Sequence, residues 1–196
     1  MKETFNLVLI YGSAREDRFC DTVADWAIKI LKTDPDLSVD IIDPAKLDLP
    51  SRHVGNTHPG VAELQSVLAE ADAFLVVTPE YNHSFTGELK LLIDAAKPEW
   101  CRKPLAFVSY GGMSGGLRAV EQLRLVFAEL HVVTMRDVVS FANVWDQFDP
   151  NGYPIDKAGS EAALKHMVND LKWWARTLRE GRYPQARAEM PEVTIS

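Results

Sequence analysis

The sequence predicts an α/β fold in three layers: a five-stranded parallel sheet of strand order 2-1-3-4-5, with helices on both faces. Short apolar runs alternate along the chain with segments whose apolar residues recur at helical spacing. A parallel strand that is buried on both faces has a continuous apolar sequence. Strict alternation of strands and helices is typical of a parallel sheet. This strand order places a ligand at the carboxyl ends of strands one and three, where the direction of winding reverses.

Five apolar segments, rich in β-branched and aromatic residues, are the expected strands. Several of them stop at glycine or proline, which commonly punctuate a strand. The strands are expected at 6–12, 38–43, 73–79, 104–111 and 131–144, with a break in the last one near Arg136.

The segments between the strands are expected to be helices. In 17–32, for example, Val23, Trp26 and Ile30 lie on one helical face, and Thr86 is a suitable N-cap for a later helix. The other helices are expected at 60–71, 86–96, 117–130 and 160–180, with long loops at 44–59 and 145–159. Residues 1–180 are expected to form a single domain and 181–196 a polar tail. The tryptophan pair at 173–174 is interpreted as a core or subunit contact.

The composition excludes some classes of function. The 196-residue chain has 28 acidic and 21 basic residues, and this net charge of −7 argues against nucleic-acid binding, which needs clustered positive charge. The two cysteines form no CxxC pair, and His53 and His58 have no evident third ligand, so no metal site is expected. No apolar stretch is long enough for a membrane span and no signal segment is evident, so we expect a cytoplasmic protein.

The loop after the first strand is a candidate phosphate site. Ser13 offers a hydroxyl donor, Arg15 offers a guanidinium that pairs with phosphate oxygens, and a helix N-terminus follows. The alternative is structural: Ser13 and Glu16 match a capping box, with the arginines solvated.

The loop after the third strand is dense in polar and aromatic side chains. Pro79, Glu80, Tyr81 and Asn82 stand at the expected ligand edge, where backbone N–H and C=O groups can address the rim of a flat aromatic cofactor. The alternatives are a surface turn capped by Asn82 and Thr86, or Glu80 acting as a general base.

The loop after the fourth strand is rich in glycine, at 111, 112, 115 and 116, which lets backbone approach a ligand closely. The same segment matches G-x-S-x-G between a strand and a helix, the context of a serine nucleophile. A small serine esterase that uses Ser114, with His131 or His166 as the base, is therefore an alternative, although no HGGG-like oxyanion segment is present.

Together, the three loops resemble the NADPH-dependent FMN reductase family, flavodoxin-like proteins that include quinone, chromate and azo-dye reductases. The likeness covers about 7–130. It rests on Gly12-Ser13-x-Arg15, Pro79-Glu80-Tyr81-Asn82-x-Ser84, Gly87-x-Leu89-Lys90, Ile93-Asp94, and Ser109 with the glycine-rich turn. The chain departs from the family at Cys20, Thr86 and Leu91, where a small hydroxyl residue, a proline and an asparagine are usual.

The resemblance implies bound FMN. Ser13 and Arg15 would contact its phosphate, with Arg18, Phe19 and Cys20 closing the same loop. Two further groups would surround the flavin: Pro79, Glu80, Tyr81 and Asn82 along the ring and ribityl chain, and Ser109, Gly112, Gly115 and Gly116 on the other side of the ring.

The resemblance also implies the reaction. NADPH or NADH would be the co-substrate, and hydride would pass from nicotinamide C4 to flavin N5 with the rings about 3–3.5 Å apart, so that no catalytic side chain is needed. The small acceptor stays open among quinones, free flavins, azo dyes and metal oxyanions. A non-enzymatic FMN electron carrier is a third hypothesis. Because the family is often dimeric or tetrameric, we expect a homodimer or homotetramer, with Arg118 and the 117–130 helix available for the contact.

Overall fold

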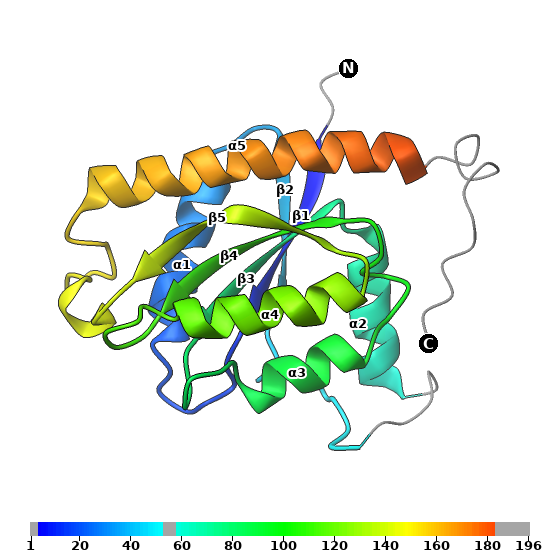
Figure 1. Ribbon diagram of the computed structural model, residues 1–196, viewed down its shortest axis with the longest axis horizontal. Helices are drawn as coiled ribbons and strands as arrows, with labels where there is room; N and C mark the ends of the chain where they lie inside the picture. Colours follow the sequence, from blue (N-terminus) through cyan, green and yellow to red (C-terminus); the bar gives the residue numbers. More distant parts are fainter. Residues whose placement is uncertain (1–3, 53–57, 183–196) are drawn as a thin grey trace.

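The computed structural model describes residues 4–52 and 58–182 and has the predicted architecture (Figure 1). Five parallel strands form one sheet in the order β2-β1-β3-β4-β5. The strands are β1 (Phe5–Tyr11), β2 (Leu37–Ile42), β3 (Ala73–Pro79), β4 (Pro104–Tyr110) and β5 (Val133–Phe141). The central strands β3 and β4 are buried along their whole length, which explains their uninterrupted apolar sequences.

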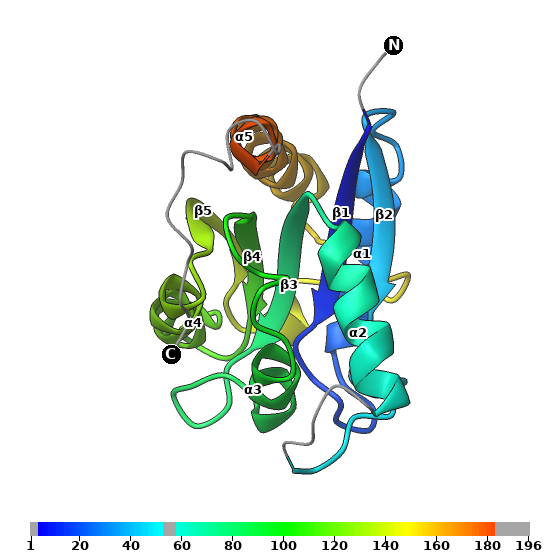
Figure 2. The same cartoon turned by 90° about the vertical axis from the view of Figure 1, so that its right-hand side faces the viewer.

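Two helical layers cover the sheet, one on each face (Figures 1 and 2). The helices are α1 (Cys20–Leu31), α2 (Pro59–Glu70), α3 (Gly87–Asp94), α4 (Leu117–Glu129) and α5 (Lys157–Arg182). One hydrophobic core joins α1 and α5 to the sheet, and the other joins α2, α3 and α4 to the opposite face. Thr86 caps α3 as predicted, because its hydroxyl accepts the Leu89 N–H at 3.1 Å.

The predicted break in the last strand is a shift of register between β4 and β5. Leu105 pairs with Thr134 and Phe107 with Val138, so β5 advances four residues while β4 advances two. A second difference concerns α5, which begins at Lys157 rather than near 160. Asp156 caps the N-terminus of α5, since its carboxylate accepts the Gly159 N–H at 3.0 Å.

The long helix α5 fastens the N-terminal ends of the strands. Lys172 pairs with Asp34 at 2.6 Å, and Arg179 pairs with Asp72 at 3.0 Å while its guanidinium lies 4.5 Å from the ring centroid of Phe5. The interpretation of the tryptophan pair on this helix as core is wrong, because Trp173 and Trp174 are 57% and 36% exposed. None of the helices formed by the described residues is both long and apolar enough to cross a bilayer.

Candidate functional site

A cleft of about 780 Å³ lies at the carboxyl ends of the strands, where the strand order predicts a ligand. Cofactor and substrate sites in proteins have volumes of roughly 300–1,000 Å³. Its lining residues come from four neighbouring strand ends: Arg15, Glu16, Asp17, Arg18 and Phe19 after β1; Pro79, Glu80 and Tyr81 at β3; Tyr110, Gly111 and Gly112 at β4; Val144 and Trp145 after β5.

The β1–α1 loop is longer than the sequence suggested. The first helix begins at Cys20, so Ser13 and Glu16 do not stand at a helix N-terminus and the capping-box interpretation is wrong. The Ser13 hydroxyl is buried and lies 3.3 Å from the Arg15 N–H, which donates to it, and 3.2 Å from the Tyr81 hydroxyl. The contact between the two hydroxyls therefore joins the loops after β1 and β3.

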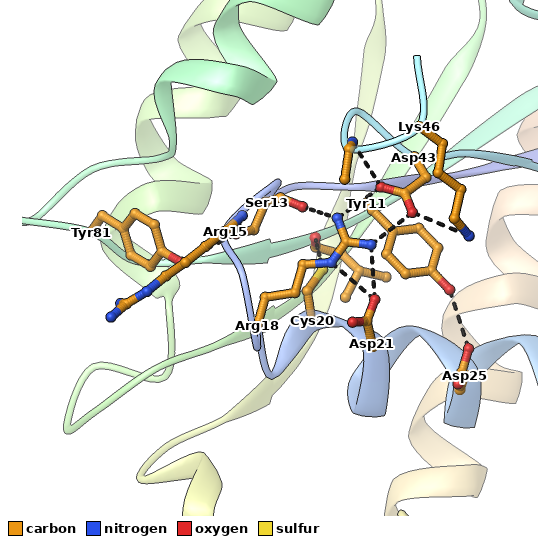
Figure 3. A network of polar contacts seen from close by, with 12 residues as sticks. Tyr11, Ser13, Arg15, Arg18, Cys20, Asp21, Asp25, Asp43, Lys46 and Tyr81 are labelled. Carbon is orange, nitrogen blue, oxygen red and sulfur yellow. Dashed lines mark hydrogen bonds and ion pairs between the residues drawn. The ribbon is translucent and has the colours of Figure 1, made fainter. Parts of the chain in front are cut away.

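Arg18 has a structural role in this loop (Figure 3). Its guanidinium donates two hydrogen bonds of 2.7 Å to the carboxylate of Asp43, at the end of β2, and a further one to the carbonyl of Ser13. The Arg18 and Asp43 side chains are only 7% and 4% exposed. Burial raises the pKa of Asp43, but hydrogen bonds from Arg18 outweigh it and hold the pKa below its ordinary value. The pair ties the candidate phosphate loop to β2.

Arg15 differs from Arg18 although it is only three residues away. Its side chain is exposed, lines the cleft and points away from the Arg18–Asp43 network (Figure 3). Arg15 is therefore the guanidinium in this loop that is placed to meet an anion from solvent.

Glu80 fastens the β3 loop to the start of α4. Its carboxylate, 8% exposed, accepts the backbone N–H of Arg118 at 3.1 Å and the Arg118 guanidinium at 3.1 Å. Burial raises the pKa of Glu80, but hydrogen bonds from Ser114 and Arg118 more than offset this and keep the pKa below its ordinary value. A carboxylate so stabilised is a poor general base.

Tyr81 belongs to a tight turn that follows Glu80. Its backbone N–H donates to the Ser84 carbonyl at 2.8 Å, and the Ser84 N–H donates to the Tyr81 carbonyl at 3.0 Å. Asn82 and His83 between them have φ of 50° and 73°, and both side chains are exposed. Tyr81 lines the cleft and Asn82 does not.

The glycine-rich turn divides into an exposed and a buried part. A Cβ on Gly112 would meet nothing within 4 Å, and this residue lines the cleft. Gly115 and Gly116 are buried, with φ of 61° and 83°, and pack against β4 and β5. The Ser109 hydroxyl donates to the Gly115 carbonyl at 2.8 Å and is likewise buried. These last three residues support the turn from beneath.

The structure thus brings most of the expected residues to one cleft but not all of them. Five of them are buried behind its surface: Ser13, Cys20, Ser109, Gly115 and Gly116. Burial raises the pKa of the Cys20 thiol to about 11. Contacts of the thirteen residues with FMN stay a prediction. The lining residues that sequence reasoning did not assign to the site are Glu16, Asp17, Tyr110, Val144 and Trp145. An aromatic residue directly after the last expected strand was a signal for Trp145.

Ser114 is not arranged as a nucleophile would be. Ser114 is one of the groups that keep the pKa of the Glu80 carboxyl below its ordinary value, whereas a nucleophilic serine needs an effective base as its partner.

A group of metal-type donors lies away from the cleft. Asp137 on β5 and His166 and Asp170 on α5 have ligand atoms within 4.8 Å of one another. All three are at least partly exposed, and Arg136 pairs with Asp137 at 2.8 Å. The absence of a metal site stays a prediction, and His53 lies outside the described residues.

Solved structures and sequence relatives agree with this architecture. FerB, described as a flavoenzyme NAD(P)H:(acceptor) oxidoreductase from Paracoccus denitrificans, superimposes with a TM-score of 0.71 at 21% identity, covering 88% of this chain and 98% of that one. An NADPH:quinone oxidoreductase of Arabidopsis thaliana is 33% identical over 91% of this chain and 95% of its own length. A 2-hydroxy-1,4-benzoquinone reductase of a Burkholderia species is 30% identical over 90% and 97%.

The comparisons also identify the family. The model of the family described as NADPH-dependent FMN reductase matches residues 5–146, which include all four strand ends of the cleft. None of the matched proteins described above is named as an esterase. The chain belongs to the NADPH-dependent FMN reductase family of oxidoreductases.

Proposed function

We propose that this protein holds FMN in the cleft and passes electrons from NADPH or NADH to a small acceptor. The observation that carries the proposal is the division of the cleft. Arg15 lies in the loop after β1, whereas Trp145 follows β5, the strand three positions farther along the sheet. A guanidinium in the first loop, together with aromatic side chains and glycine backbone in the others, matches a molecule with a phosphate and a flat ring. Bound FMN supplies the chemistry, by accepting hydride from nicotinamide and yielding electrons to the acceptor.

The residues of the chain bind and orient in this proposal. Ser13 and Arg15 hold the phosphate, while Arg18 keeps their loop in place through Asp43. Tyr81 and the Gly111–Gly112 backbone lie along the ring. The Gly111 N–H already donates to the Phe141 carbonyl at 3.2 Å, so the Gly112 N–H is the group that we expect to stabilise negative charge on a bound ring.

The shape of the glycine-rich turn is fixed by three buried residues beneath it: Ser109, Gly115 and Gly116. Phe19, which lines the same cleft, shields it from water, and Cys20 belongs to the core beneath.

The acceptor we propose is a quinone. Relatives that match nine-tenths of the chain are named as quinone reductases, and the open aromatic end of the cleft suits a flat ring. We further propose a cytoplasmic homodimer or homotetramer in which the outer face of α4 takes part, because Leu117 and Leu125 are 45% and 75% exposed there.

The absorption spectrum of the purified protein tests the flavin. We expect a yellow protein that releases FMN rather than FAD on denaturation and whose colour bleaches when NADPH or NADH is added without air. Steady-state kinetics should be ping-pong if donor and acceptor use one place in turn. A protein that binds FMN but is not bleached would be an electron carrier, and a protein that does not bind FMN at all would refute the proposal.

Replacing Arg15 by alanine should weaken FMN binding by about 10- to 150-fold, because a charge-assisted hydrogen bond contributes roughly 1.5–3 kcal/mol. The fold should be unaffected, since the side chain is exposed and stands outside the Arg18 network. A fluorescence titration with FMN measures the change. Arg136→Ala is the matched control: its side chain is 95% exposed, away from the cleft, and FMN affinity should not change. Equal affinities for the two variants would remove Arg15 from the phosphate site.

A further inference from the structure

Trp145 is unusual among the large apolar residues of this protein. It is 66% exposed, yet it lines the cleft rather than an outer surface. An indole exposes a large apolar area, and such side chains at a cleft are typical of recognition sites. A residue that forms the floor beneath a cofactor is covered by its neighbours. Trp145 instead stands at the rim, where its ring can meet a molecule that arrives from solvent.

The backbone around Trp145 is fixed to the glycine-rich loop. The Asn143 N–H donates to the Gly112 carbonyl at 2.8 Å, and the Val144 N–H donates to the Gly111 carbonyl at 3.0 Å. Val144 is 1% exposed and anchors the turn in the core. Trp145 is therefore held next to Gly111 and Gly112, the backbone that we place along the FMN ring.

An aromatic cluster supports this turn from below. The ring centroids of Phe148 and Phe141 are 4.9 Å apart, and Phe148 is 5.6 Å from Phe19, which also lines the cleft. Farther along the loop, Tyr153 has the ammonium groups of Lys29 and Lys157 at 4.7 and 4.9 Å from its centroid. These contacts attach the loop that follows Trp145 to α1 and α5 and so fix its backbone.

We propose that Trp145 stacks on the ring of a flat aromatic electron acceptor and so selects such acceptors over compact, non-aromatic ones. The inference rests on the proposed function and adds a specificity-determining residue to it. An acceptor must lie beside the bound FMN to receive electrons. Trp145 is an aromatic side chain of the cleft that is largely open to solvent, and it follows β5, three strands from the loop that carries Arg15.

The test compares Trp145→Ala, Trp145→Phe and Trp173→Ala, all loaded with FMN. Trp173 is a matched control because it is 57% exposed but on α5, outside the cleft. Each protein is reduced with dithionite and mixed with benzoquinone, which takes two electrons and two protons, or with ferricyanide, which takes one electron and no proton. Binding of 2-naphthol to the oxidised holoprotein is measured by calorimetry, and FMN affinity by titration.

We expect Trp145→Ala to raise the Kd of naphthol and to lower the second-order rate constant for benzoquinone by about 3- to 10-fold, the range given by aromatic stacking. Ferricyanide rates and FMN affinity should stay within about twofold, Trp145→Phe should restore most of the loss, and Trp173→Ala should behave as the starting protein. The inference would be overturned if Trp145→Ala left both the Kd of naphthol and the rate constant for benzoquinone unchanged. It would also be overturned if the rate constants for benzoquinone and ferricyanide fell equally, or if FMN affinity fell. Loss of an oligomer in sedimentation only in Trp145→Ala would also overturn it, by assigning the indole to a subunit contact. Failure of the starting protein to bind FMN would instead refute the proposed function.

Discussion

Replacing Gly116 by valine is expected to destabilise the fold by about 4 kcal/mol. The residue has φ of +83°, and a Cβ there would stand 2.8 Å from both the backbone nitrogen and oxygen of Tyr110 in β4. A left-handed conformation costs an L-residue roughly 1–2 kcal/mol, and overpacking adds roughly 1–3 kcal/mol. Small proteins have only about 5–15 kcal/mol of stability, so urea unfolding followed by circular dichroism will detect the change.

Gly112→Ala is the control for this experiment. Gly112 belongs to the same turn as Gly116, but its φ is not left-handed and an added Cβ would meet nothing within 4 Å. It should unfold within about 1 kcal/mol of the starting protein, as do most substitutions without a named mechanism. If Gly116→Val were as stable as Gly112→Ala, the close packing of the turn on β4 would be wrong.

Replacing Arg18 by methionine is expected to lower the free energy of unfolding by about 3–5 kcal/mol, because it leaves the carboxylate of Asp43 buried without its main partner. That carboxylate is 4% exposed, and the remaining cation, Lys46, is 3.5 Å away on a side chain that is 84% exposed. FMN affinity should fall as well, since Arg18 also holds the carbonyl of Ser13. The exposed Arg15→Met, on the same loop, should change stability by less than about 0.5 kcal/mol.

The pH dependence gives the Arg18–Asp43 pair a separate signature. In the folded protein the pKa of Asp43 lies below its ordinary value of 3.8, so the unfolded chain binds the proton more readily. The stabilisation by the pair is therefore complete above about pH 4 and is lost as the pH falls below it. Without Arg18, burial raises the pKa of Asp43 in the variant, so the difference in stability between the starting protein and Arg18→Met should begin to narrow above pH 4 and shrink further below it. A difference that is independent of pH between 2 and 7 would contradict the ion pair.

The pattern predicted the fold because β1, β3 and β4 are buried along almost their whole length and are therefore short apolar runs bounded by helical segments. Ala73–Pro79 has the observed bounds, and the shift of register in β5 was visible as a break in an apolar run. The start of α1 was not predictable, since a pair between residues 25 positions apart, Arg18 and Asp43, keeps 12–19 out of the helix. Local propensity carries no information about such a contact.

The loops that form the cleft were predicted from strand order, whereas only some of the predicted residues line it. Strand order assigns a loop to the ligand edge, whereas the direction of each side chain depends on the turn that the loop makes. Ser109 and Gly115 therefore belong to the right loop but bond to each other beneath the surface. Trp145 was missed because the rule for this topology points to the loops after strands one and three, and the loop after β5 reaches the cleft through two backbone bonds to Gly111 and Gly112.

The position of α5 also determines when this chain can fold during synthesis. The helix is the last described element, and its residues Leu164, Met167 and Leu171 complete a core with Val108 of β4 and Val139 of β5. Its pair from Lys172 to Asp34 joins residues 138 positions apart. Until α5 leaves the ribosome, one face of β4 and β5 lacks the helix that covers it. A chain that is stalled before Lys157 consequently exposes an apolar sheet face to other chains, and such faces aggregate.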